Sequence, residues 1–376
     1  MTTRLSNVVR QKFVNYFTTK HGHKFVRSSS VVPNNDSSLA FVNAGMNQFK
    51  PLFLADLDNY SPSRVCNYQK CIRVGGKTCD LDKIGRDFTH HTFFEMLGNW
   101  SFNDYGKPQA CEWALDFLVN ELNLDMSKLH VTYFSSKNEE DLETRDIWLK
   151  LGVHPEHITA NDQGDNFWEM GASGPCGIST EIFYPVGEDL LEIWNLVFID
   201  RHRLADNPSK IVPLRSRFVD TGMGLERILS VLCKTNSNYD TDLFENLFKA
   251  IETKSGLKPY GGSLTDELDI NYRILADHCR MITVALADGI EPGRREAAFN
   301  LRTIIKKSVL ISRDIFRQET PRYLLFDLVD ETVNILGDAY PELPASVKKI
   351  RRTLAHESKR YLEYLNKTAN MNSELN

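Results

Sequence analysis

The sequence has no hydrophobic run that approaches the roughly 20 residues of a membrane-spanning helix, and no apolar signal-peptide core precedes its first predicted helix. We therefore expect a protein that is neither secreted nor inserted in a membrane. Internal repeats and low-complexity segments are also missing. With 376 residues, 41% of them hydrophobic and 10% aromatic, the chain has enough apolar side chains for two or three folded domains.

Metal-ligand spacings are missing as well. The seven cysteines are scattered, without a C-x-x-C pair and without a nearby His-x3-His partner. Free thiols in a reducing compartment explain this distribution better than disulfides or a zinc site. We expect an intracellular protein that holds no structural metal.

The chain also lacks an excess of positive charge. Its net charge of −5 argues weakly against a general affinity for nucleic acids. The distribution is uneven, however. Between Arg294 and Arg317 seven basic residues stand against two acidic ones, and a second basic run lies between Lys348 and Arg360. On amphipathic helices such runs provide contacts for phosphates, although a merely solvated helix face has the same composition.

Periodicity divides the chain into a mixed part and a helical part. Ser6 is a candidate N-cap, apolar residues recur every four positions after it, and Gly22 stands where a C-cap belongs, which predicts an amphipathic first helix. Further helices are predicted at Pro108–Leu122 and Asp141–Leu151, and strands at His130–Phe134, Ser179–Tyr184, Leu190–Asp200 and Ser216–Asp220. After residue 240 only helices are predicted, at Thr241–Lys254, Asp266–Ala287, Arg295–Arg317, Pro321–Leu336 and Ala345–Leu365, with a frayed polar tail from Thr368.

The segment Asp220–Arg227 combines a strand end, two glycines and the start of a helical pattern. We expect Gly222 and Gly224 to form a tight turn and Arg227 to lie in the first turn of the helix, where backbone N–H groups favour anions. A guanidinium there can hold a phosphate, and Asp220 is a natural counter-ion for an ammonium group. A structural strand-turn-helix joint with a surface arginine is the alternative.

A second segment places Arg73 before two glycines, Lys77 and a charged loop, and it is followed by the aromatic return His90–Gly98. An arginine on one strand, a flexible loop and an aromatic return are what a triphosphate site needs: the arginine holds a phosphate while a ring stacks on adenine. An exposed hairpin with core aromatics would give the same pattern.

Both segments resemble motifs 2 and 3 of class II aminoacyl-tRNA synthetases, in the form found in alanyl-tRNA synthetases. Further similar stretches are Phe41–Lys50, Asp165–Gly171, Glu192–Phe198 and Ala276–His278, and the resemblance runs from Leu5 to Leu365. It implies an α+β fold: an antiparallel sheet flanked by helices at 1–240, the catalytic domain, followed by an all-helical domain at 241–376 that recognises the tRNA acceptor stem.

The resemblance implies ATP-dependent activation of L-alanine to alanyl-adenylate, then transfer to the 3′ end of tRNA(Ala). Arg73 would hold the α-phosphate and the alanine carboxylate, and Arg227 the γ-phosphate, as the two catalytic residues. Mg²⁺ is expected with ATP. The other residues expected around ATP are Lys77, His91, Phe94, Trp168, Ile193, Trp194, Asn195 and Gly224. The residues expected around alanine are Asp220 for its ammonium group, Trp168 and Val197 as walls, and Asn195 to orient it.

The residues expected to bind tRNA are Arg294, Arg295, Arg302, Lys306 and Lys307. The altered segments 172–185 and 292–300 and the pair Thr78-Cys79 depart from the family pattern, in a way similar to animal mitochondrial forms. We expect a mitochondrial protein, with a cytoplasmic one as the alternative. The editing domain and its zinc ligands are not in this sequence, so neither editing nor zinc is expected, and a monomer is favoured. A catalytically silent tRNA-binding or regulatory relative remains the alternative function.

Overall fold

The computed structural model describes residues 3–34, 36, 39–55, 59–74, 81–171, 173–207 and 210–374, with the backbone alone for 371–374. The chain forms two compact units. The first consists of residues 1–29, 44–70 and 95–236, and the second of 30–43, 71–94 and 237–376. The second unit therefore takes two segments from the part of the chain that precedes residue 240. The division into a catalytic and a tRNA-recognition domain stays a prediction.

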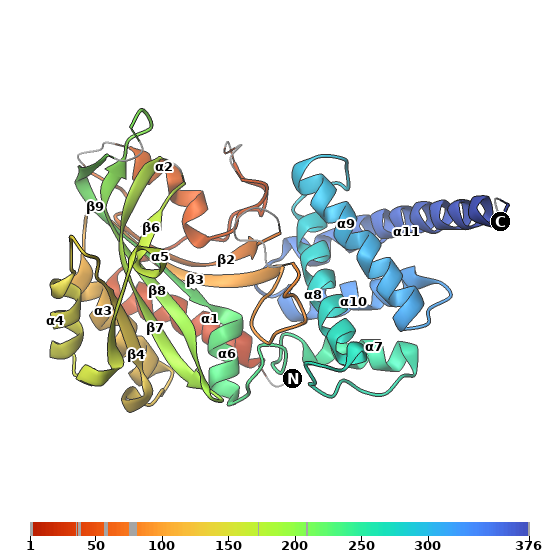
Figure 1. Ribbon diagram of the computed structural model, residues 1–376, viewed down its shortest axis with the longest axis horizontal. Coiled ribbons are helices and arrows are strands. Elements are labelled where there is room, and N and C mark those ends of the chain that lie inside the picture. Colours follow the sequence, from red (N-terminus) through yellow and green to blue (C-terminus); the bar gives the residue numbers. More distant parts are fainter. Residues whose placement is uncertain are drawn as a thin grey trace. The chain divides into compact units, whose positions relative to one another are not determined.

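A nine-stranded sheet is the framework of the first unit, and the predicted α+β fold is confirmed (Figure 1). Its main path has the order β1-β2-β3-β9-β8-β7-β4-β5, and β6 pairs with β7. The pairs β3–β9, β9–β8, β8–β7 and β7–β4 are antiparallel as expected, but β1–β2 and β4–β5 are parallel, so the sheet is mixed. The strands are β1 Lys24–Phe25, β2 Arg64–Ile72, β3 Phe93–Phe102, β4 His130–Phe134, β5 Ile158–Asn161, β6 Phe167–Glu169, β7 Gly174–Val186, β8 Asp189–Arg203 and β9 Ile211–Gly224.

Helices cover the sheet because their apolar faces need a partner. The helix α1 (Leu5–Asn15) continues as a π-helical turn, Tyr16–Lys20, and lies next to α6 (Leu225–Cys233) (Figure 1). Its Phe13 and the following Phe17 contact Trp194 of β8, with ring centroids 5.8 and 6.4 Å apart. The other helical elements are α2 Lys50–Leu54, α3 Lys107–Asp116, α4 Leu142–Lys150 and α5 Gln163–Asn166, with a π-helical turn at Phe117–Glu121 and 3-10 turns at Gly45–Phe49, Met126–Lys128 and Pro155–His157.

Ser6 is not the N-cap that the sequence suggested. The helix begins at Leu5 after Arg4, and Ser6 is buried within its first turn. The opposite end agrees with the expectation, because Gly22 has a positive φ of 68° and the His23 N–H donates to the Phe17 carbonyl at 3.0 Å. This is the backbone pattern of a glycine C-cap, here after the π-helical turn.

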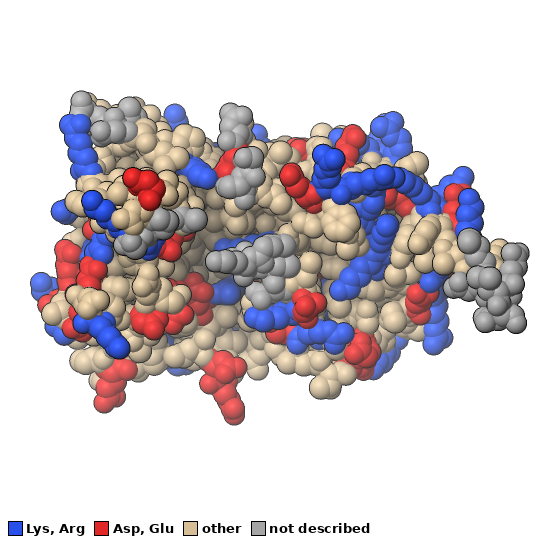
Figure 2. All heavy atoms as spheres, turned by 45° about the horizontal axis from the view of Figure 1, so that its top comes forward, with Lys and Arg blue, Asp and Glu red and all other residues tan. Residues whose placement is uncertain are grey.

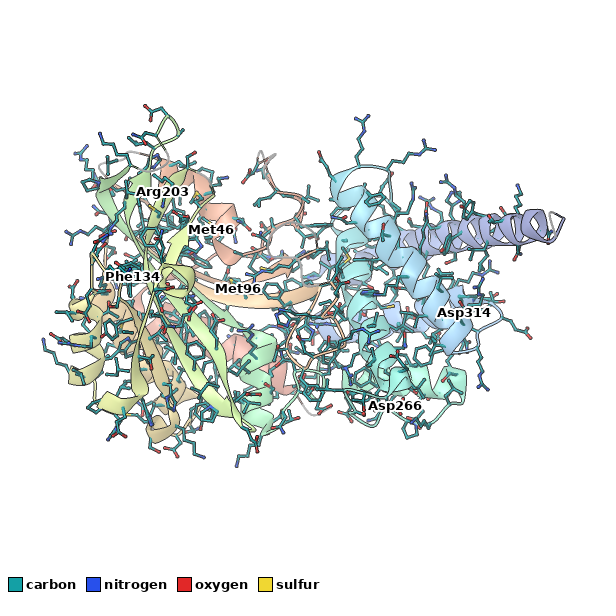
Figure 3. The ribbon with its side chains drawn as sticks, in the orientation of Figure 1. Met46, Met96, Phe134, Arg203, Asp266 and Asp314 are labelled. Atoms are coloured by element: carbon teal, nitrogen blue, oxygen red, sulfur yellow. The ribbon has the colours of Figure 1, made fainter. Side chains whose placement is uncertain are left out.

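A second hydrophobic layer forms around Trp100 of β3. Its core consists of the buried residues Met46, Phe49, Phe53, Val65, Trp100, Phe102, Val197, Ile199 and Phe218. Figure 3 labels Met46, which belongs to this core, and Met96, which lies on β3. Since Trp194 contacts the α1 rings whereas Val197 belongs to this layer, the side chains of β8 alternate between two cores.

The helical part of the second unit agrees with the predicted pattern. It consists of α7 Glu245–Ser255, α8 Glu267–Ala287, α9 Glu296–Leu310 with a π-helical turn Ile311–Ile315, α10 Pro321–Leu336 and α11 Glu342–Glu374. Nearly all side chains of α8 are buried. The tail expected to fray from Thr368 is instead the last part of α11. Within the described ranges, no helix combines the length and the apolar character needed to cross a membrane.

The N-terminal segments of the second unit are bound to the helical part through hydrogen bonds of buried and half-buried polar groups. The Val31 N–H donates to Asp288 Oδ2 at 2.7 Å, and the Thr92 N–H donates to both carboxylate oxygens of Asp277, at 3.0 and 3.1 Å. The guanidinium of Arg273 donates from Nε to the Gly85 carbonyl at 2.7 Å. These bonds fix the segment that carries Arg73 to α8.

Candidate active site

One face of the sheet in the first unit brings together three of the residues predicted around alanine. In the register of β8 and β9, Asn195 lies opposite Gly222 and Val197 lies opposite Asp220. Directly paired residues share a face of the sheet, so the amide, the isopropyl group and the carboxylate are neighbours. The fourth residue, Trp168 of β6, is half-buried and packs against the hydrophobic cluster that includes Val197.

Glycines on the same face leave room for two large side chains. A Cβ atom at Gly98 would lie 2.2 Å from Cη2 of Trp100, and one at Gly222 would lie 2.7 Å from Sδ of Met96. Both positions therefore require glycine for a close approach of side chains. Gly222 and Gly224 do not form the expected tight turn, because β9 continues through Gly224 and α6 begins at the next residue.

Asp220 is the charged centre of this face. The indole Nε1 of Trp100 donates to its Oδ1 at 2.6 Å, and we find no other hydrogen bond to this carboxylate among the described residues. Burial raises the pKa of Asp220 to about 7, and the indole donor partly opposes that rise. A buried carboxylate whose ionised form is costly gains strongly from a cationic partner, such as the ammonium group of an amino acid.

Glu181, which the sequence reasoning did not assign, lies on the same face, opposite Asn195. The amide of Asn195 donates from Nδ2 to Glu181 Oε1 at 3.0 Å. Burial, helped by the neighbouring charges of Glu192 and Asp165, raises the pKa of Glu181 to about 8.

We expect Glu181 to make stability depend on pH. Its folded pKa of about 8 is above its ordinary 4.5, so the folded state binds the proton more tightly. The free energy of unfolding should therefore fall as pH rises from about 4.5 to about 8, and Glu181→Gln should remove part of that fall. Thermal unfolding of both proteins between pH 5 and pH 9 measures the difference. Parallel curves over this range would contradict the expectation.

Arg227 lies in the first turn of α6, as predicted. Its Nη1 donates to the carbonyl of Glu192 at 2.8 Å and to Glu192 Oε2 at 2.9 Å. These bonds hold the guanidinium beside the start of α6, where the helix dipole favours anions. A Cβ atom at Gly224 would lie 3.4 Å from Cδ of Arg227, so this glycine gives the arginine its space. Glu192 is a further residue of this site, without a role predicted from the sequence.

Ile193 and Trp194 are less accessible than Glu192 and Asn195, the residues on either side of them. Both side chains are buried, and Trp194 lies among the rings of Phe13, Phe17 and Phe117. Only their backbone would be available to an adenosine, while Asn195 presents its side chain to the face that carries Asp220.

The second unit holds Arg73, His91 and Phe94. The exposed Arg73 has its guanidinium carbon 4.9 Å from the ring centroid of Phe94, and its Nε donates to the Asn43 carbonyl at 3.2 Å. Its backbone N–H donates to the Thr92 carbonyl at 2.9 Å, and Thr92 is bound to Asp277. The arginine is thus oriented by its neighbours while its head remains accessible. Lys77 and Ala172 lie outside the described residues.

The side chain of His91 is almost completely buried, whereas a residue that binds a phosphate must be accessible to it. Its side chain is 2% exposed, its Nδ1 lies 3.3 Å from Asp277 Oδ1, and its Nε2 is 3.2 Å from Asn238 Nδ2. The ring stacks on Phe244 at a centroid distance of 5.3 Å. These contacts give it a structural place beside α8, and its contact with ATP stays a prediction.

The predicted tRNA contacts occupy different environments. Arg294 and Arg295 precede α9 and are exposed. Arg302 is bound within the protein: Nε donates to Glu357 at 2.9 Å, and its two Nη atoms reach the carbonyls of Gly293 and Pro292 at 2.8 and 2.7 Å. It therefore links α9 to α11 and to the preceding loop. Lys306 lies over the ring of Tyr361, and Lys307 is exposed.

Residues 8–375 match the family described as tRNA synthetases class II (A). The chain belongs to this family. Among the described residues of this family member, we find no cluster of three or more His, Cys, Asp or Glu side chains suited to a metal.

Similar proteins include alanine–tRNA ligases of two compartments. The cytoplasmic enzyme of Bombyx mori is 43% identical over 98% of this chain and 40% of its own length. The mitochondrial enzyme of Drosophila melanogaster is 46% identical over 94% of the chain and 37% of its own. This class II synthetase chain thus spans about 40% of the length of the curated relatives that it matches. A crystal structure of apo S. aureus histidyl-tRNA synthetase is 9% identical, with a TM-score of 0.39, over 64% of this chain and 71% of that one.

Proposed function

We propose that this chain activates L-alanine with ATP to form alanyl-adenylate and transfers the alanyl group to the 3′ end of tRNA(Ala). The observation that carries the proposal is the shared sheet face of Asn195, Val197 and Asp220 in a class II synthetase. Its relatives named alanine–tRNA ligase support the choice of amino acid.

The reaction needs positioning and charge stabilisation more than a protein nucleophile, because the alanine carboxylate itself attacks the α-phosphorus of ATP and pyrophosphate leaves. Asp220 would bind the ammonium group and Asn195 would orient the amino acid. Arg73 would hold the α-phosphate and the carboxylate. Arg227 would hold the γ-phosphate, exchanging its present bonds to Glu192 for bonds to the nucleotide.

Magnesium fits as the counter-ion of ATP. Glu192 supplies carboxylate oxygens beside Arg227, the ligand type that Mg²⁺ prefers, and it would hold the ion together with the phosphates. When bound, the ion neutralises phosphate charge.

Alanine would fit between Trp168 and Val197. A small apolar pocket rejects larger side chains by steric overlap, but it discriminates only weakly against glycine, which lacks one methyl group, and against serine. We therefore expect measurable misactivation of both.

The remaining assignments follow from the same proposal. Residues 1–240 would serve catalysis and 241–376 would bind the tRNA acceptor stem, through Arg294, Arg295, Lys306 and Lys307 in particular. We propose a mitochondrial location, with a cytoplasmic one as the alternative, since relatives of both compartments match. We also propose that the chain is a monomer. No observation favours a catalytically silent relative.

Alanine-dependent exchange of labelled pyrophosphate into ATP tests the proposal. We expect exchange with alanine, weaker exchange with glycine and serine, and strongly reduced exchange in Arg73→Ala. A folded protein that binds ATP but shows no alanine-dependent exchange would contradict the proposed activity.

A further inference from the structure

A depression of about 310 Å³ lies between α9 and α11 in the second unit. Its volume is at the lower end of the range of small-ligand sites. The residues that line it are Gly293, Arg294, Phe299, Arg302, Lys306, Glu357, Arg360, Tyr361 and Tyr364.

Aromatic rings of this pocket are unusually exposed. Phe299 is 54% exposed and Tyr364 is 62% exposed. The rings of Tyr361 and Tyr364 are nearly parallel, with an interplanar angle of 12° and centroids 6.5 Å apart. Single exposed aromatic residues need no explanation, but two exposed rings and the half-buried Tyr361 around one depression offer flat faces to a ligand.

Positive charge surrounds these rings. Arg294, Lys306 and Arg360 contribute three cations, and the one acidic residue of the lining, Glu357, is already bound to Arg302. The Nζ of Lys306 lies 5.2 Å from the Tyr361 ring centroid. Figure 2 shows Lys and Arg side chains gathering over this part of the surface, where Figure 1 draws α9.

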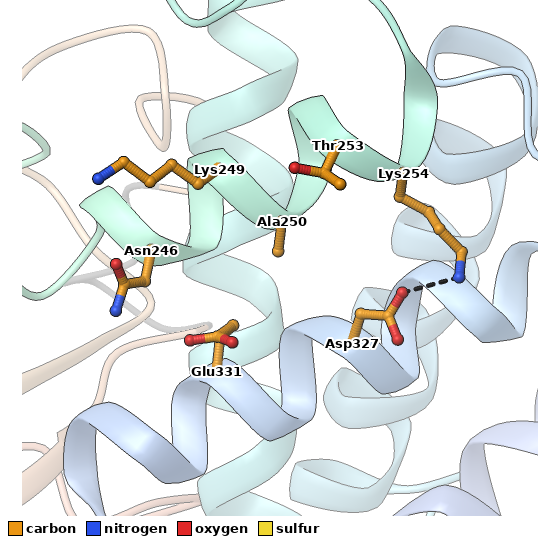
Figure 4. A pocket seen from close by; sticks show the side chains of 7 residues that line it. All are labelled: Asn246, Lys249, Ala250, Thr253, Lys254, Asp327 and Glu331. Carbon is orange, nitrogen blue, oxygen red and sulfur yellow. Dashed lines mark ion pairs between the residues drawn. The ribbon is translucent and has the colours of Figure 1, made fainter.

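A second depression, of about 520 Å³ between α7 and α10, shows that this composition is not shared by every groove of the unit (Figure 4). Its two lysines, Lys249 and Lys254, are balanced by Asp327 and Glu331, and Lys254 pairs with Asp327 at 2.9 Å. No aromatic ring lines it. Neither stacking nor anion binding is favoured there.

We propose that the α9–α11 pocket binds one unpaired nucleotide of an RNA. The base stacks on Tyr364 and Phe299, and Arg294 and Arg360 hold its phosphates. Exposed rings with cations beside them suit a splayed nucleotide, since the faces of bases in a duplex are covered by their neighbours. The inference rests on the proposed function for its partner, tRNA, and adds a site that the basic residues alone do not define.

Two kinds of substitution test it, with fluorescence anisotropy of a labelled tRNA(Ala) transcript as the readout. Tyr364→Ala and Phe299→Ala should each weaken binding about tenfold, whereas Tyr364→Phe should bind as the unchanged protein does, because one stacked base contributes about that factor. Arg360→Ala should lower the slope of log affinity against log salt by about one, which the ring variants should leave unchanged. Matched controls are Tyr323→Ala, a ring 49% exposed on α10, and Lys249→Ala on α7.

Two further probes identify the ligand. A blunt-ended RNA duplex with the acceptor-stem sequence should bind equally to Tyr364→Ala and to the unchanged protein, and AMP alone should bind weakly at most. If Tyr364→Ala lowers duplex binding as much as tRNA binding, or if no ring variant affects tRNA, the proposal is wrong. Binding of AMP that depends on Tyr364, without an effect on tRNA, would overturn it in favour of a free-nucleotide site.

The pyrophosphate exchange assay separates this proposal from the proposed function. Exchange requires no RNA, so Tyr364→Ala should exchange at the unchanged rate. Absence of exchange in the unchanged protein would refute the synthetase activity, and the ring variants would still decide whether RNA uses the pocket.

Discussion

Asp220→Asn is expected to lower kcat/KM for alanine by about 10²- to 10³-fold while the protein stays folded. The change removes the charge that would pair with the ammonium group, and truncating one partner of a buried charge pair has effects of this size. Asparagine has the same shape and can still accept the hydrogen bond from Trp100. The measurement is alanine-dependent pyrophosphate exchange, with Asp189→Asn, an exposed position on β8, as the control.

The pH dependence of the two proteins adds a second readout. Because the pKa of Asp220 is about 7 without a ligand, KM for alanine should rise about tenfold per pH unit below 7 in the unchanged protein and stay flat in Asp220→Asn. The folded pKa exceeds the ordinary 3.8, so Asp220 also lowers the free energy of unfolding as pH rises from about 4 to 7. At pH 8 the variant should therefore melt no lower than the unchanged protein. Unaltered alanine kinetics would refute the assignment.

Arg73→Ala is expected to reduce adenylation by about 10³-fold with little change in Tm. A preorganised donor to the charge that develops on the α-phosphoryl group has an effect of this order. Stability should change little because Arg73 is exposed: its Nε donates to the Asn43 carbonyl, and its guanidinium lies over the face of Phe94. Arg73→Lys should recover only part of the rate, since an ammonium cannot bind two oxygens in the planar manner of a guanidinium.

Arg86→Ala provides the matched control. Arg86 is also an exposed arginine of the second unit, with a side chain 55% exposed and 3.7 Å from Glu267. Single-turnover formation of the adenylate, measured with saturating ATP, isolates the chemical step from nucleotide binding. Equal rates in Arg73→Ala and Arg86→Ala would contradict the role given to Arg73.

Local patterns predicted those elements whose ends depend on local chemistry. The strand His130–Phe134 and the helix Pro321–Leu336 have the predicted bounds: an apolar run defines the first, and a proline at the first helical position begins the second. The turn expected at Gly222 and Gly224 was wrong for a tertiary reason. Gly222 makes room for Met96, more than a hundred residues earlier in the chain, and such a contact leaves no local signal.

The candidate site shows the same division. The arginines and Asp220 could be selected because their residue types match phosphate and ammonium chemistry. The half-buried acid Glu181 could not, since its burial depends on the register of β7 against β8. Arg302 looked like its basic neighbours in the sequence, but Glu357 on α11 binds it inside the fold.

The second unit combines early segments of the chain with the helices after residue 237, which determines whether those helices can be separated from the rest. Asp277 and Asp288, on and just after α8, accept backbone N–H groups from Thr92 and Val31, both of which precede residue 240. A fragment beginning at residue 237 would leave these carboxylates without those donors. The helical part is thus not a transplantable module. Its fusion to another protein would need the earlier segments supplied in trans or grafted with it.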